Sequence, residues 1–133
     1  MATQSGKLLE LTLDEQAVIV QFGNRLVAEN RFAEAANVFE LLRAIDPGQA
    51  FYHRTFGICC ERTNRLDEGL AALDQALGLD PGDVFALTAR AAIRMRTGDR
   101  AGAAQDLQAA QVAIGADQTL LSEQISVMLK AVA

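Results

Sequence analysis

The sequence predicts an all-α protein in which pairs of helices stack side by side into a solenoid. One observation is a repeated turn: Asp46-Pro47-Gly48 returns as Asp80-Pro81-Gly82, 34 residues later, an interval typical of helical repeat arrays. The other is composition, because half of the residues are apolar while only 5% are aromatic. Many small apolar residues suit helices that approach closely, whereas strands favour β-branched and aromatic side chains.

Further positions repeat at the same interval and identify the kind of repeat. Two of them hold small residues, a third holds a large apolar residue, and a fourth holds residues that tolerate a left-handed backbone. In the order just given, these sets are Gly23/Gly57/Ala91, Ala35/Gly69/Ala103, Phe39/Leu73/Leu107 and Asn30/Asn64/Gly98. Small residues let the two helices of a pair touch, large residues fill the space between pairs, and proline ends the second helix. This is the tetratricopeptide (TPR) pattern.

The repeat frame places each helix. We expect six repeat helices, at residues 13–29, 32–45, 49–62, 66–79, 83–96 and 100–113. Thr12 with Glu15 reads as a capping box at the first helix, and Asp83 and Asp99 are suitable N-caps. The chain is then one TPR domain over residues 1–133, with repeats at about 16–49, 50–83 and 84–117.

The two ends of the array are expected to be helical as well. A short helix is predicted at about residues 5–11. After Asp117, another expected cap, apolar residues recur at helical spacing through residues 118–132. We interpret this segment as a capping helix that covers the apolar face of the last repeat.

The third repeat departs from the pattern. Arg90 and Arg94 stand where the earlier repeats have Phe22/Phe56 and Leu26/Cys60. Either this helix is slightly rotated, or the two arginines extend to the edge of the stack.

Charge and composition exclude several classes of function. The net charge of −5 and the pI of about 4.8 argue against nucleic acid as a partner. No apolar run reaches the roughly 18 residues that a membrane span needs, and residues 1–10 lack the layout of a secretory signal. We therefore expect a cytoplasmic protein that does not insert into membranes.

Side chains with catalytic chemistry are sparse, and we expect no enzyme, no cofactor and no metal site. His53 is the only histidine, and no His or Cys cluster has metal-ligand spacing. Cys59 and Cys60 are adjacent, which excludes a disulfide framework and favours buried spacers. Carboxylates such as Asp99 and Asp106, like Asp67 and Glu68, read as helix caps or solvated faces.

A groove for another polypeptide is the function that the repeats favour. In stacked helix pairs the first helices line a concave surface, and its expected side chains are mainly apolar. The predicted partner-binding residues are Val20, Asn24, Val27, Phe51, Arg54, Ile58, Phe85, Thr88, Ala92 and Met95. Such a surface suits an extended segment that inserts hydrophobic anchors, although some of these residues would only pack against neighbouring helices.

A carboxylate clamp of the kind that holds chaperone tails is not supported. Asn24 occupies one position typical of such TPR domains, but Val20 stands where a lysine is expected. Arg54 and Arg96 remain candidates for contact with acidic groups of a partner.

Beyond the bare repeat, the chain resembles one family over about residues 13–132. The resemblance rests on Arg31-Phe32-Ala33-Glu34-Ala35, on Phe56-Gly57-Ile58-Cys59, on Ala109 to Ile114 and most specifically on Leu121 to Ala131. These segments resemble the class II chaperones of type III secretion, the LcrH/SycD-like translocator chaperones.

The resemblance implies an ATP-independent cytoplasmic chaperone that seats a Pro- and Leu-bearing segment of a hydrophobic translocator in its groove. It also implies a homodimer through N-terminal helices, although the N-terminal extension here is short. Val20, Asn24 and Val27 stand at positions where the family's first-repeat groove is commonly aromatic, so the client can differ.

Two other classes of function remain open. One is a TPR adaptor or scaffold that joins folded proteins. The other is an enzyme or redox protein that uses His53 or the adjacent cysteines.

Overall fold

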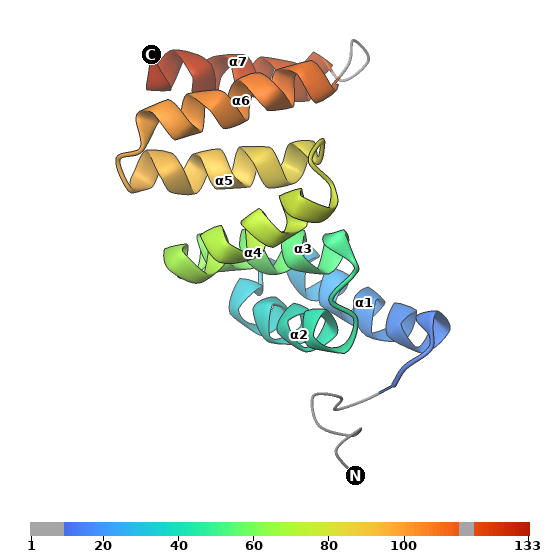
Figure 1. Ribbon diagram of the computed structural model, residues 1–133. Helices are drawn as coiled ribbons and strands as arrows, with labels where there is room; N and C mark the ends of the chain where they lie inside the picture. Colours follow the sequence, from blue (N-terminus) through green and yellow to red (C-terminus); the bar gives the residue numbers. More distant parts are fainter. Residues whose placement is uncertain (1–9, 115–118) are drawn as a thin grey trace.

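The computed structural model describes residues 10–114 and 119–133 of the chain. Within these ranges every regular element is a helix. The helices are α1 (Leu13–Ala28), α2 (Phe32–Ile45), α3 (Ala50–Arg62), α4 (Leu66–Leu79), α5 (Val84–Arg96), α6 (Arg100–Ile114) and α7 (Thr119–Val132). They stack in chain order, with α1 and α7 at opposite ends (Figure 1). The predicted all-α solenoid is confirmed, and each predicted repeat helix lies within one residue of its observed bounds.

Side-chain caps fix where three of the helices begin. The Thr12 hydroxyl accepts from the Glu15 amide at 3.1 Å, and the Glu15 carboxylate accepts from the Thr12 amide at 2.9 Å. Asp83 caps α5 by accepting from the amides of Phe85 and Ala86. Asp99 accepts from the Gly102 amide at 2.9 Å. The three predicted caps are therefore confirmed.

Two predictions at the ends of the array fall partly or wholly outside the described residues. Asp117, the expected cap of the last helix, lies outside them. Of the expected short helix at residues 5–11, only residues 10 and 11 are described, and they are not helical.

The turns inside the helix pairs use the left-handed backbone that the sequence predicts. Asn30, Asn64 and Gly98 have φ angles of 59°, 63° and 89°. An asparagine or glycine adopts this conformation at low cost, so each pair closes with a tight turn of constant geometry.

Close approach of α3 and α4 explains the small residues of the repeat. A Cβ at Gly57 would lie 2.6 Å from Leu73 Cγ and 3.2 Å from the Gly69 carbonyl oxygen. Phe39, Leu73 and Leu107, the predicted filling residues, are fully buried. The repeat positions assigned from the sequence are therefore the positions that pack in the core.

The third repeat contains an ionic cluster between α5 and α6. Arg90 binds both oxygens of Asp106 at 2.7 and 3.1 Å, and Arg94 Nη1 lies 2.9 Å from Asp106. Asp106 is only 3% exposed, and its hydrogen bonds to the Arg90 guanidinium raise the pKa of Arg90. The prediction that Asp106 is a cap or a solvated carboxylate was wrong. It is the buried partner that lets two arginines occupy apolar positions of the repeat.

No helix in the described part of the chain is both long and apolar enough to cross a membrane.

Candidate functional site

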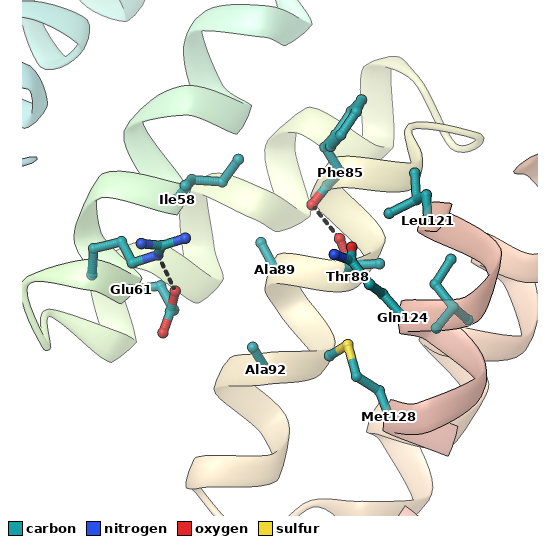
Figure 2. A pocket seen from close by; sticks show the side chains of 11 residues that line it. Ile58, Glu61, Phe85, Thr88, Ala89, Ala92, Leu121, Gln124 and Met128 are labelled. Atoms are coloured by element: carbon teal, nitrogen blue, oxygen red, sulfur yellow. Dashed lines mark hydrogen bonds and ion pairs between the residues drawn. The ribbon is translucent and has the colours of Figure 1, made fainter. Parts of the chain in front are cut away.

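An open pocket of about 280 Å³ lies where α3, α5 and α7 meet (Figure 2). Most of its lining is apolar, with a few polar side chains among it. The residues that line it are Ile58, Glu61, Arg62, Phe85, Thr88, Ala89, Ala92, Leu121, Gln124, Ile125 and Met128.

The spacing of the lining residues shows why this pocket forms. Phe85, Ala89 and Ala92 recur at helical spacing, so they share one face of α5. Ala89 and Ala92 are small and leave room between the helices, whereas Met128 faces them from α7 (Figure 2). Methionine is flexible and adapts to irregular apolar groups. The pocket can therefore take an apolar side chain without a polar partner.

Charged side chains stand at one side of the pocket. Glu61 Oε2 lies 3.0 Å from Arg96 Nη1, and Glu61 Oε1 lies 3.5 Å from Arg62 Nε. The Arg62 guanidinium also lies 5.1 Å from the centroid of the Phe32 ring. Two arginines thus share one carboxylate, which leaves a local surplus of one positive charge.

An aromatic stack extends the pocket toward the N-terminal half of the solenoid. Arg54 lies over both Phe51 and Phe85, 5.0 and 5.7 Å from the ring centroids. It also forms an ion pair with Asp83 at 3.1 Å. Phe85 is 54% exposed, whereas Phe51 packs edge-on against the buried Phe39. The stack therefore joins α3 to α5 and presents Phe85 to solvent beside the pocket.

The ten predicted groove residues fall into three groups. Four of them line the pocket: Ile58, Phe85, Thr88 and Ala92. Phe51 and Arg54 adjoin it through the stack. The remaining four lie outside it: Val20 and Val27 pack partly against the N-terminal core, Met95 packs against the C-terminal core, and Asn24 is exposed.

The contribution of α7 is what sequence reasoning missed. The C-terminal segment was expected only to cover the last repeat, yet Leu121, Gln124 and Met128 form one wall of the pocket. A usable signal was present, because α7 follows α6 where the first helix of a fourth pair would stand. It therefore falls on the same side of the stack as α3 and α5.

Arg54 and Arg96, the candidates for contact with an acidic partner, are both paired within the chain. Arg54 binds Asp83, and Arg96 binds Glu61 and Asn64.

His53, Cys59 and Cys60 lie outside the lining of this pocket and are buried in the fold. His53 is 4% exposed; its Nε2–H donates to the Pro47 carbonyl at 2.7 Å, and its Nδ1 accepts from Arg43 Nε at 3.0 Å. Burial raises the pKa of both Cys59 and Cys60 to about 11. Over residues 10–114 and 119–133, no group of three or more His, Cys, Asp or Glu side chains could hold a metal ion.

Comparison with solved structures shows which proteins share this fold. PcrH bound to the chaperone-binding region of PopD matches with a TM-score of 0.87 and 20% identity, over 94% of this chain and 96% of that one. The translocator chaperone SycD of Yersinia enterocolitica matches with a TM-score of 0.87 and 20% identity, over 92% and 86%. The TPR2AB domain of yeast Sti1, in a complex with Hsp90, matches at 0.80 and 16%, over 92% of this chain and 48% of that one.

No known protein family and no curated protein matches the chain by sequence. The structural likeness therefore establishes a TPR-like solenoid, shared with chaperones of type III secretion. The similar proteins named above are chaperones and a TPR domain, not enzymes.

Proposed function

We propose that the protein is an ATP-independent cytoplasmic chaperone that holds an extended segment of a secreted, translocator-type protein in its groove. One observation carries the proposal. An apolar pocket lies between α3, α5 and α7, in a solenoid of the same fold as PcrH bound to a region of PopD and SycD bound to a peptide of YopD.

The physical need for such a chaperone follows from the client. A protein destined for a membrane carries long apolar segments, which aggregate when exposed to water. A groove that is already formed does not have to be ordered on binding, so the main entropy cost falls on the client segment. Such a site needs no nucleotide, cofactor or metal, and catalysis is not part of the proposal.

The site residues belong to the same proposal. The ten predicted groove residues, from Val20 to Met95, would contact the client, and the α7 residues Leu121, Gln124 and Met128 are added to them. The whole chain would act as one TPR domain, with repeats at about 16–49, 50–83 and 84–117 and a capping helix at about 118–132 that doubles as a groove wall.

A TPR adaptor remains the second candidate, because the TPR2AB domain of Sti1, which is described in a complex with Hsp90, shares the fold. An adaptor would join two folded proteins and leave their solubility unchanged. A chaperone would keep an otherwise aggregating client soluble, so client solubility separates the two functions.

The first prediction is that Phe85→Glu weakens client binding by about tenfold or more while helix content is unchanged. Phe85 is exposed at the pocket, and a glutamate there removes the apolar surface that the client would bury. As the client in this test we take a protein that has long apolar segments and is encoded by a neighbouring gene. It is co-expressed with the chain, and a labelled segment of it is then titrated. Val112→Glu is the matched control, since Val112 is 88% exposed on α6 and lies outside the pocket.

A soluble complex that depends on Phe85 but not on Val112 supports the proposal. A client that stays soluble alone, or that binds Phe85→Glu as well as the wild type, contradicts it.

A further inference from the structure

The pocket at α3, α5 and α7 has both an apolar floor and a surplus of positive charge at its edge. We propose that it selects a partner segment in which a large apolar side chain has an acidic neighbour. The apolar side chain would enter the pocket and the carboxylate would meet Arg62. This inference rests on the proposed function, because it specifies which feature of the client the groove recognises.

The size of the pocket fits a single large side chain. Its volume is about 280 Å³, and an apolar cavity of roughly 150 Å³ with similar lining is already large enough for benzene. Ile58, Leu121 and Met128 supply apolar contacts from α3 and α7. A bulky apolar side chain is therefore accommodated together with part of the backbone that carries it.

The charge at the edge of the pocket indicates which kind of residue stands beside the apolar side chain in the partner. Glu61 and Arg62 are the two charged residues of the lining. The carboxylate of Glu61 is already held by Arg96 at 3.0 Å, whereas its contact with Arg62 is 3.5 Å. Arg62 is 56% exposed in its side chain. A guanidinium with exposed N–H groups prefers a carboxylate, which it can bind with two parallel hydrogen bonds.

The local charge is opposite to that of the whole molecule. The chain carries a formal charge of −5, so its net charge does not attract acidic segments. The Arg62–Glu61–Arg96 group has a net charge of +1 from the charges of its members. An acidic residue in the partner thus fixes which part of the groove its apolar neighbour enters.

A purely structural role for Arg62 is the competing explanation. Its contact with Phe32 joins the end of α3 to the start of α2, and this contact alone would account for an arginine here. The two roles differ in one result. If Arg62 has only a structural role, replacing it changes the stability of the protein and the affinity for all peptides alike. If Arg62 recognises the partner, replacing it changes the charge preference of the peptides that bind.

The test is selection from a random-peptide display library on the full chain, followed by titration of the enriched peptides. Wild-type protein should enrich peptides in which a large apolar residue stands beside Asp or Glu. Replacing that acidic residue by its amide should weaken binding by about two- to fivefold, as for an exposed ion pair. Arg62→Glu should reverse the preference to Lys or Arg, while Arg25→Glu, on α1 and outside the pocket, should not.

Filling the pocket tests its apolar half. Ala92→Phe should weaken the enriched peptides by about tenfold or more, as lost burial of a large side chain predicts. Gln124→Trp provides a second filling variant, because Gln124 is exposed on α7 and its replacement does not disturb the core. Melting temperatures close to that of the wild type verify folding of each variant.

The outcomes separate this inference from the proposed function. Peptides that bind both filled variants undiminished, or that show no charge preference, overturn the inference even when the translocator-type client still binds. A library that yields no enriched peptide also counts against it. Failure of the wild-type chain to bind the co-expressed client overturns the proposed function itself.

Discussion

At the scale of single residues, the packing of the two helices in a pair depends on glycines, which have no side chain. Gly57 and Gly69 bring the backbones of α3 and α4 into contact, and Leu73 fills the space beside Gly57. Because the interior is closely packed, a side chain added at Gly57 has to displace the Leu73 side chain and presses on the Gly69 carbonyl oxygen. By contrast, Gly78 has no atom within 4 Å of the position where its Cβ would lie.

We predict that Gly57→Leu lowers the free energy of unfolding by about 1–3 kcal/mol, the usual cost of overpacking. Gly78→Ala is the control and should stabilise the protein by up to about 1 kcal/mol, since alanine favours a helix over glycine. Denaturant unfolding followed by circular dichroism measures both. Equal stability of Gly57→Leu and the wild type would show that the helix pairs do not meet at this residue.

The cysteine thiols provide a second prediction at this scale. Burial raises the pKa of Cys59 and Cys60 to about 11, so both remain protonated thiols at neutral pH, and only the thiolate is nucleophilic. We expect a disulfide reagent to react slowly with the folded protein and rapidly in denaturant. Fast reaction of a folded thiol would favour the redox alternative.

At the scale of helices, α5 and α6 contact each other through charged side chains at positions where the second repeat has apolar residues. Arg90 and Arg94 replace Phe56 and Cys60 of the second repeat, and Asp106 replaces Ala72. Removing Asp106 takes away the buried partner of both arginines and leaves them only more exposed ion pairs, Arg90 with Asp74 at 2.9 Å and Arg94 with Asp99 at 3.7 Å. Replacing a whole buried ionic group by apolar residues is often neutral.

Asp106→Ala is therefore expected to destabilise the protein by about 1–3 kcal/mol, the cost of unsatisfied buried polar groups. The triple variant with Arg90→Phe, Arg94→Leu and Asp106→Ala, which restores the apolar pattern of the earlier repeats, should recover most of that loss. Thermal unfolding compares the two variants. A triple variant less stable than the single one would mean that the ionic cluster itself holds the third repeat together.

Helix limits were predictable from the sequence, but contacts between helices were less so. Asn30, Asn64, Gly98 and the two Asp-Pro-Gly turns mark where helices stop, and this signal is local. The Asp106 partnership joins residues from two helices, so neither helix alone reveals it. Likewise, Leu121 and Met128 have the spacing of a buried face, but only the stacking order shows that α5 and α7 form a pocket between them.

At the scale of the whole molecule, we propose the exposed apolar surface of α1 as the surface at which a second copy would bind. Val18 and Phe22 are 68% and 51% exposed and lie one helical turn apart, so they share a face. SycD, which has the same fold, is described in a structure with an alternative dimer. A symmetric dimer pairs the same surface of both copies.

If the chain forms a homodimer, we expect this face to hold it together. Light scattering coupled to gel filtration would then give twice the monomer mass for the wild type and the monomer mass for Phe22→Glu. A dimer unaffected by Phe22→Glu would place the interface elsewhere on the molecule.

We propose that the side of the stack formed by α3, α5 and α7 holds an extended segment of another protein. Amide chemical-shift mapping is the test, with the isotope-labelled chain titrated by its client segment. We expect the large shifts to cluster at Phe85, Ala92 and Met128 and their neighbours. Shifts confined to α2, α4 and α6, with none at the pocket, would contradict it.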